Sequence, residues 1–300
     1  MKFHHTTKKM TDIIQRYGCA SEGSKFLDLN GIRFHYREFG QREKPTLVLI
    51  HGIVDSLHTW ELLISHLKDN YHLVTIDLPG FGLSDIIPID DDMVKSIVDH
   101  LNDAFKELNL SKFHLVGNSL GGLIAWNYSF HYSESVDKLI LLSPGAFYQK
   151  FPWIFDISHP LINKVIRKTG RFSLKHLIPL TGPMVPGLVY NFENLSYIRQ
   201  QFRRIADLMT CEENFENYIN ILEAAYHYDF KDSLKIPEIQ NEILLIHGRK
   251  DRVIPMEPQV QKWRRLIPGL KVLNPDDSAH MPQWEKPELL SREIKKFLSS

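Results

Sequence analysis

The sequence has few cysteines and no excess charge of either sign. Cys19 and Cys211 are the two cysteines among 300 residues. They are too few for a disulfide framework, and reduced thiols in a reducing compartment are the expectation. Lys plus Arg equals Asp plus Glu at 36 each, so no net field attracts nucleic acid or an anionic membrane. The composition therefore argues against a nucleic-acid-binding protein.

Long apolar runs are also missing. Asp12, Gln15 and Arg16 interrupt what would be the hydrophobic segment of a signal peptide. No segment approaches the roughly 18 apolar residues that a membrane-spanning helix needs. We expect a cytoplasmic protein without a stable membrane span, either a monomer or a homodimer. Residues 1–24 are predicted to form a loosely ordered N-terminal arm, with an amphipathic membrane contact of residues 8–17 as the alternative.

Strand-like segments alternate with helix-like segments along most of the chain. Asn30-Gly31 is a turn signal between two extended segments and predicts an antiparallel hairpin. Six further segments are short apolar runs, as in strands covered on both faces, and helical spacing separates several of them. The pattern predicts an α/β fold with a mostly parallel eight-stranded sheet flanked by helices. The predicted strands are 25–29, 33–39, 46–50, 72–76, 113–117, 137–142, 242–246 and 270–274, and the predicted helices are 90–109, 120–132 and 284–298.

One long segment, residues 146–236, breaks this alternation. It contains no strong strand, and helical stretches are predicted at 195–209 and 212–229. A segment of that length is too long for a structureless loop. We predict a helical cap over the carboxyl edge of the sheet, where ligands bind in open α/β folds, and a core formed by residues 25–145 and 237–300.

The cap is rich in aromatic residues and carries a group of arginines. The aromatic residues predict either a pocket for a hydrophobic acyl or alkyl group or simple packing of the cap on the core. The arginines, at helical spacing, are expected to form a solvated face. The aromatic residues include Phe147, Tyr148, Phe151, Trp153 and Phe155, and the arginines are Arg199, Arg203 and Arg204.

The strongest motif is GNSLG at residues 117–121, which fits G-x-S-x-G. It follows a predicted buried strand and precedes a predicted helix, as a nucleophile on a sharp strand-to-helix turn requires. Neighbouring segments crowd the positions two before and two after such a serine, so Gly117 and Gly121 are needed there. Ser119 is therefore the predicted nucleophile.

A serine hydroxyl needs a base to remove its proton. Of the fifteen histidines, His280 follows the last predicted strand and precedes the last predicted helix, which is the position expected of the base. Packing or solvation explains the histidines inside predicted strands and helices better. These are His66, His72, His100, His114 and His131.

An acid should follow a strand that lies between the serine and the histidine in the chain. Asp251 lies just beyond the predicted strand 242–246 and is the candidate that orients His280. Asp276 and Asp277 are only three or four residues before the histidine, and a surface-loop role suits them better. Ser119, Asp251 and His280 are thus the predicted catalytic triad.

Two backbone N–H groups should stabilise the tetrahedral intermediate. One comes from the residue after the nucleophile, Leu120, and the other from the loop after the third strand, Ile53. Gly52 lets the chain turn sharply at the end of that strand. His51 is expected to form a hydrogen bond within the loop and not to act as the base.

With these motifs in order, the sequence resembles the α/β-hydrolase superfamily, and most of all its capped esterase-like and lipase-like members. The resemblance runs from about residue 25 to residue 298. It rests on HG (51–52), DLPGFGLSD (77–85), GNSLGG (117–122), GRKDRVIP (248–255) and SAHMPQWEKP (278–287). It implies the α/β-hydrolase fold, the same three catalytic residues, and a purely structural role for residues 77–85 beside the oxyanion loop.

The resemblance also orders the candidate reactions. Haloalkane dehalogenases and epoxide hydrolases of this fold have aspartate at the nucleophile position, so Ser119 argues against both. The expected function is hydrolysis of a small-molecule carboxylic ester with no metal or other cofactor. Carbon–carbon bond hydrolysis of the meta-cleavage-product type is the alternative, although its usual oxyanion loop is richer in glycine than His-Gly-Ile-Val. A ligand receptor that has lost turnover is the third reading.

Overall fold

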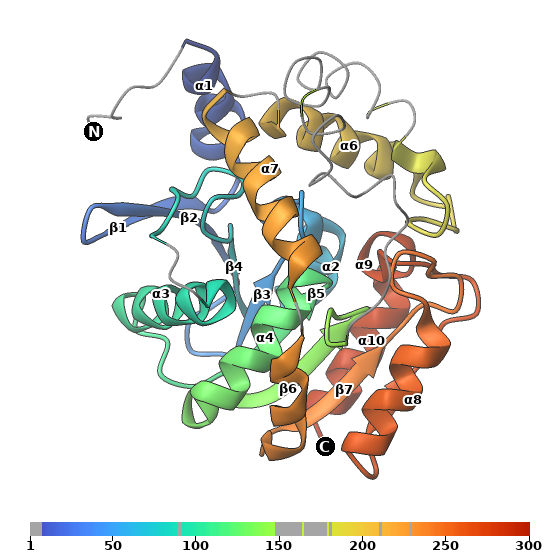
Figure 1. Cartoon of the computed structure of the whole chain (residues 1–300). Coiled ribbons are helices and arrows are strands. Elements are labelled where there is room, and N and C mark those ends of the chain that lie inside the picture. The colour runs from blue at the N-terminus through green and yellow to red at the C-terminus, as the bar shows by residue number, and fades with distance from the viewer. Residues whose placement is uncertain are drawn as a thin grey trace.

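The computed structural model describes residues 8–88, 92–147, 182–209, 212–228 and 230–300, together with Lys164 and Pro179. These residues form an eight-stranded sheet in the order β1-β2-β4-β3-β5-β6-β7-β8 (Figure 1). β1 and β2 form the predicted hairpin, β2 is also antiparallel to β4, and the remaining pairs are parallel. The predicted α/β fold is confirmed. The strands are β1 (Ser24–Leu29), β2 (Ile32–Phe39), β3 (Thr46–Ile50), β4 (His72–Ile76), β5 (Phe113–Asn118), β6 (Val136–Leu142), β7 (Glu242–Ile246) and β8 (Lys271–Leu273).

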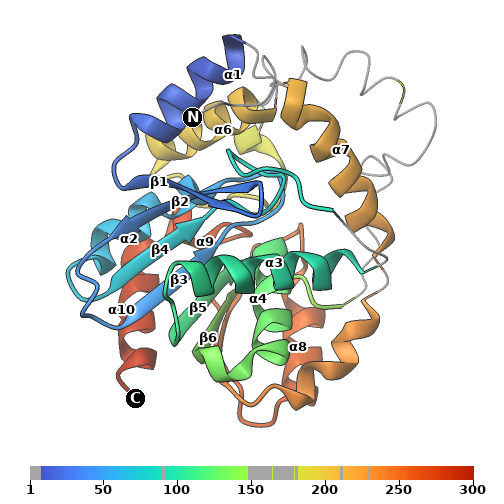
Figure 2. The same ribbon diagram turned by 90° about the vertical axis from the view of Figure 1, so that its left-hand side faces the viewer.

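Side chains of the central strands alternate between two buried clusters, one on each face of the sheet. In β3, Val48 and Ile50 belong to one cluster and Leu47 and Leu49 to the other. This alternation explains why these strands are continuous apolar runs. Two helix layers supply the rest of the core: α3 (Met93–Glu107), α4 (Leu120–His131) and α8 (Met256–Leu266) cover one face, and α2 (Glu61–Leu67) and α10 (Pro287–Leu298) cover the other (Figure 2).

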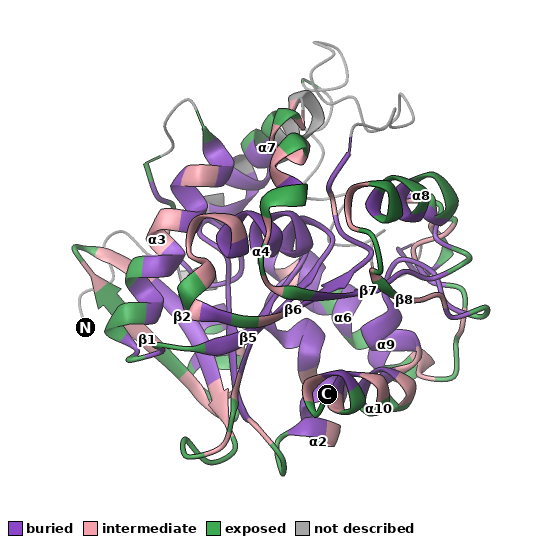
Figure 3. Cartoon of the chain, turned by 90° about the horizontal axis from the view of Figure 1, so that it is seen from below, coloured by how far each residue is buried: buried purple, intermediate pink, exposed green. Residues whose placement is uncertain are grey.

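The surface helices are amphipathic, as their positions against the sheet require. In Figure 3 the buried residues of α3, α8 and α10 lie toward the sheet and their exposed residues point outward. Asp92 caps the N-terminus of α3 by accepting a hydrogen bond from the backbone N–H of Lys95 at 2.9 Å. α8 lies where the sequence made no specific prediction, and Trp263 on its inner side is fully buried.

The last predicted helix, 284–298, is in fact two helices. α9 (Pro282–Glu285) ends before Lys286, and α10 begins at Pro287. Proline is favoured at the first position of a helix because it has no N–H to leave unsatisfied. Pro287 therefore starts a new helix where the periodicity alone predicted a continuous one.

The N-terminal segment is helical from Lys8 to Cys19 and buries Ile13 and Ile14, which differs from the loosely ordered arm that the sequence predicts. α1 (Lys8–Ile13) continues into a π-helical turn, η1 (Ile14–Cys19). Ile13 and Ile14 are buried against Leu83 and Leu208. These two side chains pack against the loop after β4 and against residues near 208, which are distant in the sequence, so no local pattern could predict the contact.

Two helices of the predicted cap lie among the described residues: α6 (Leu195–Met209) and α7 (Glu212–His227). Both contact the loops that follow β3 and β4. The hydroxyl of Tyr197 donates to the carbonyl of His58 at 3.0 Å, and the N–H of Gly82 donates to the hydroxyl of Tyr218 at 3.2 Å. α6 and α7 therefore lie over the carboxyl ends of these strands, as Figure 1 shows.

Several sequence predictions for the cap fall outside the described residues. These are the aromatic residues Tyr148, Phe151, Trp153 and Phe155, as well as Cys211. Phe147 is described: it is buried and meets the ring of Trp263 edge to face at 5.8 Å. For this aromatic residue, packing on the core explains its position.

The arginine group is only partly the solvated face that was predicted. Arg199 and Arg203 are exposed, but Arg204 is 6% exposed and its Nη2 lies 3.3 Å from Glu61 Oε1 on α2. In a helix, residues four apart share a face, whereas the next residue turns about 100° away. Arg204 thus points toward the core and connects α6 to α2.

Candidate active site

Ser119 occupies the turn between β5 and α4. Its backbone has φ 55° and ψ −115°, a left-handed conformation that an L-residue adopts only when its surroundings impose it. A Cβ at Gly117 would overlap the backbone of Gly121, and a Cβ at Gly121 would overlap the carbonyls of Ile50 and His51. Gly117 is therefore required by the close approach of β5 and α4, and Gly121 by the close approach of α4 and the end of β3.

His280 and Asp251 lie together at the carboxyl edge of the sheet, on the loops after β8 and β7. His280 Nδ1 is 2.8 Å from Asp251 Oδ2, and both side chains are buried. Asp251 Oδ1 accepts hydrogen bonds from the N–H groups of Val253 and Ile254 at 2.9 and 2.8 Å. Burial by itself would raise the pKa of Asp251, but His280 and His247 lower that pKa to well below its usual value. Asp251 is thus a fixed carboxylate beside the imidazole.

The Asp251 contact determines the tautomer of His280. An ionised carboxylate can only accept hydrogen bonds, so the proton of neutral His280 is on Nδ1. Its Nε2 is then free to accept a proton. This is the tautomer that a general base needs.

A second histidine, His247, contacts the same carboxylate and was not singled out in the sequence. Its Nε2 lies 3.1 Å from Asp251 Oδ2 and 2.8 Å from the carbonyl oxygen of Ile254. With two oxygens facing it, Nε2 must carry the proton. His247 directly follows β7 and lies four residues before Asp251. This position was the sequence signal that could have identified it as a partner of Asp251.

Asn118, the variable residue before Ser119, connects the serine turn to the histidine loop. Its amide Nδ2 donates to the carbonyls of Leu142 and His280 at 3.1 and 3.2 Å. Its Oδ1 accepts from Gln283 Nε2 at 3.2 Å. The residue next to Ser119 thus holds the main chain of His280 directly, and this brings the predicted serine and histidine onto adjoining loops.

The predicted oxyanion donors are next to the serine. A Cβ at Gly52 would lie 3.2 Å from the Cβ of Ser119, so the loop that carries Ile53 abuts the serine. Leu120 is the first residue of α4, where backbone N–H groups have no acceptor within the helix. Within the described part of the chain, neither the N–H of Ile53 nor that of Leu120 donates to another residue. Both are thus available for an anionic oxygen.

His51 forms hydrogen bonds within the loop after β3 and to the loop after β4. Its Nε2 accepts from the N–H of Leu78 at 2.9 Å, and its Nδ1 lies 2.7 Å from the carbonyl of Gly52. Since Nε2 is an acceptor, the proton is on Nδ1. Complete burial lowers the pKa of His51, which favours the neutral ring that both hydrogen bonds require.

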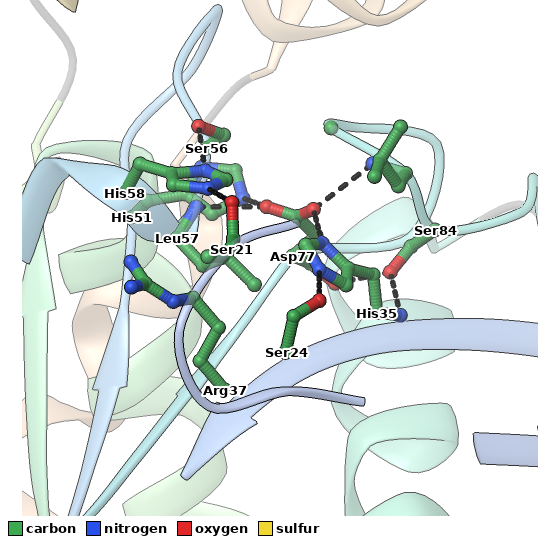
Figure 4. Close-up of polar contacts among 12 residues, drawn as sticks. Ser21, Ser24, His35, Arg37, His51, Ser56, Leu57, His58, Asp77 and Ser84 are labelled. Atoms are coloured by element: carbon green, nitrogen blue, oxygen red, sulfur yellow. Dashed lines mark hydrogen bonds and ion pairs between the residues drawn. The ribbon is translucent and has the colours of Figure 1, made fainter. Parts of the chain in front are cut away.

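A buried hydrogen-bond network centred on Asp77 also holds the loop after β3 (Figure 4). Asp77 is 1% exposed. Its carboxylate accepts from the N–H groups of Leu57 and Leu83 at 2.7 and 2.9 Å, and it lies 2.7 Å from His35 Nδ1. His35 Nε2 is in turn 2.8 Å from Ser24 Oγ. This network joins β1, β2 and the loops after β3 and β4, which fits the structural role expected of residues 77–85.

Among the residues that the structure describes, no group of three or more His, Cys, Asp or Glu side chains is arranged to hold a metal ion. No described helix is both long enough and apolar enough to span a membrane.

Comparisons with known proteins identify the family to which the chain belongs. A family model described as the alpha/beta hydrolase fold matches residues 45–287. Epoxide hydrolase 3 of Xenopus tropicalis is 24% identical over 294 residues, covering 90% of this chain and 75% of that protein. A 2-hydroxy-6-oxononadienedioate/2-hydroxy-6-oxononatrienedioate hydrolase of Escherichia coli is 24% identical, covering 92% of this chain and 96% of that protein.

Solved structures show the same fold. A thermophilic esterase from Thermogutta terrifontis superposes with a TM-score of 0.73 at 22% identity, covering 92% of this chain and 98% of the esterase. At this identity the likeness concerns the fold alone. Because the family model spans most of the sequence, the chain belongs to the alpha/beta hydrolase fold family and is a hydrolytic enzyme.

Proposed function

We propose that the chain hydrolyses carboxylic esters through an acyl-enzyme formed on Ser119. The observation that carries this proposal is the buried hydrogen bond between His280 and Asp251, on a loop that Asn118 connects to the serine turn. This arrangement provides an imidazole that a carboxylate orients through Nδ1, on a loop that adjoins a serine on a strained turn.

The reaction proceeds in two acyl-transfer steps. Ser119 Oγ attacks the ester carbonyl while His280 Nε2 takes the hydroxyl proton. Asp251 stabilises the imidazolium, and the N–H groups of Ile53 and Leu120 stabilise the oxyanion. The alkoxide leaves with the proton from His280. Water then attacks the acyl-enzyme, His280 again accepts and returns a proton, and Ser119 is regenerated.

Carbon–carbon bond hydrolysis is the second candidate. The Escherichia coli relative is named for oxo-dienedioate substrates and is matched over nearly its whole length. Epoxide hydrolysis is not a candidate, although one relative is named an epoxide hydrolase. Epoxide hydrolases of this fold have aspartate at the nucleophile position, where this chain has Ser119.

The test compares wild type with Ser119→Ala on aryl esters of graded acyl length and on a dienol-type diketone acid. Ester hydrolysis should fall by roughly a millionfold in Ser119→Ala, as nucleophile removal costs in a serine protease. Ser65→Ala, which removes an exposed hydroxyl on α2, is the matched control and should retain wild-type turnover. A fluorophosphonate should label wild type and not Ser119→Ala.

The outcomes separate the candidates. Labelling of Ser119 without turnover of any ester, together with cleavage of the diketone acid, would favour the carbon–carbon hydrolase. Labelling without turnover of either substrate class would favour a receptor. Absence of labelling would contradict the role of Ser119 as nucleophile.

A further inference from the structure

Glu285, the last residue of α9, is a buried carboxylate that the proposed mechanism does not use. It is 1% exposed. Buried carboxylates are costly unless hydrogen bonds compensate them, and Glu285 accepts four. Oε1 accepts from the N–H groups of Tyr190 and Asn191 at 2.6 and 2.8 Å. Oε2 accepts from the hydroxyl of Ser278 at 3.0 Å and from the N–H of Ala279 at 2.8 Å.

The two oxygens serve two different segments. Oε2 holds residues 278–279, which immediately precede His280. Oε1 holds residues 190–191, in the segment that leads into cap helix α6. The same segment contacts the Asp251 loop, because the N–H of Arg252 donates to the carbonyl of Gly187 at 3.4 Å.

We propose that Glu285 is a positioning residue that fixes the backbone of the His280 loop and couples that loop to the cap segment 187–194. The proposal rests on the proposed function, since it concerns the placement of His280 as the base. Glu285 does not touch the reacting atoms. It acts through Ala279, whose N–H it holds and whose carbonyl carbon is bonded to the nitrogen of His280.

A carboxylate is the group that this position requires. Three of the four donors are backbone N–H groups, which cannot reverse their direction, and both oxygens face at least one of them. A glutamine has one oxygen and one NH₂ group, so either orientation places NH₂ against a backbone N–H. An aspartate is shorter by one methylene and cannot reach both segments. Burial raises the pKa of the Glu285 carboxyl, and the N–H groups of Asn191, Tyr190 and Ala279 counteract this rise.

The expected effect is on catalysis because proton transfer depends on short, aligned distances. A displacement of about 1 Å in a reacting group can lower a rate about 100-fold. Loss of the Ala279 hydrogen bond frees the residue next to His280 while Asn118 still holds the carbonyl of His280. The His280 loop therefore loses one of the hydrogen bonds that hold its backbone.

The experiment measures fluorophosphonate labelling in wild type, Glu285→Gln and Tyr128→Phe, with separate determination of the rate constant and of the labelled fraction. Tyr128→Phe removes a buried hydrogen bond of 3.2 Å to Asn102, in the core away from the site, and is the control for general destabilisation. In Glu285→Gln the labelling rate constant and kcat for a small aryl ester should fall together by about 10- to 100-fold, with KM changed less than about threefold. Tyr128→Phe should retain both rates.

Other outcomes would overturn the proposal. A purely structural role would reduce the labelled fraction of Glu285→Gln and leave the rate constant of the labelled molecules at the wild-type value. If Glu285→Gln does not fold, Ser278→Ala replaces it in the test. It removes one donor and should lower the rate constant a few-fold at full labelled fraction, so an unchanged rate constant overturns the proposal. Absence of labelling in wild type would instead contradict the proposed function.

Discussion

Asp55, in the oxyanion loop, gives a prediction about the pH dependence of stability. Its side chain is 4% exposed, Oδ1 accepts from the N–H of Ser56 at 2.8 Å, and Oδ2 has no hydrogen-bond partner among the described residues. Burial raises the pKa of Asp55 from 3.8 to about 7. The folded protein therefore holds this proton more tightly than the unfolded chain, and the protonated form stabilises the fold.

The sign and size of the effect follow from linkage. The stabilisation is fully present below the unfolded pKa of 3.8 and is lost as pH rises through the folded pKa of about 7. At about 1.4 kcal/mol for each pH unit between the two values, the loss is on the order of 4 kcal/mol. Asp55→Asn has no titrating group at this position and should not show this loss.

The assay is urea unfolding of wild type and Asp55→Asn between pH 4 and pH 8, followed by the fluorescence of the five tryptophans. The difference in unfolding free energy between the two proteins cancels the groups that they share. We expect wild type to lose about 4 kcal/mol relative to Asp55→Asn over this range, so that the variant is the more stable protein at pH 8. The reasoning would be refuted if the difference in unfolding free energy between the two proteins changed by less than about 1 kcal/mol from pH 4 to pH 8.

Three further predictions concern the site and the N-terminal segment. Asp251→Asn should lower kcat about 10⁴-fold, because the amide favours the wrong tautomer of His280; a loss below about tenfold in ester assays would contradict this role. Gly121→Ala should destabilise the fold by about 1–3 kcal/mol, because its Cβ overlaps two β3-end carbonyls, and a wild-type melting temperature would contradict it. Tyr17→Phe removes a 2.6 Å hydrogen bond to Asp207 on α6. In amide hydrogen exchange, the free energy of protection of residues 13–19 should fall by about 1 kcal/mol, while that of β5 remains unchanged.

Much of the fold could be predicted because its signals are local. A strand buried on both faces must be apolar at every position, so β3 and β4 were predicted with their observed bounds. The strand-to-helix turn likewise requires glycines at fixed offsets, which Gly117 and Gly121 supply. The order of serine, acid and histidine along the chain then identified one candidate for each position.

The tertiary structure decided which polar groups meet. Asn118 donates to the carbonyl of His280 and Glu285 accepts from residues 190–191, and nothing in their own neighbourhoods predicts those contacts. His247 differs, because its partner Asp251 lies four residues further along the same loop. Arg204 belongs to a charged stretch that looks solvated until the rotation of α6 turns it toward Glu61.

Residue type and spacing within short segments were thus enough to predict the sheet, the strained serine turn and the candidate triad. Only the three-dimensional structure decided how the histidine loop, the cap segment and the N-terminal helix are held. The physical reason is that a buried hydrogen bond or apolar contact is specified by both partners, and these partners are brought together by the packing of the whole chain.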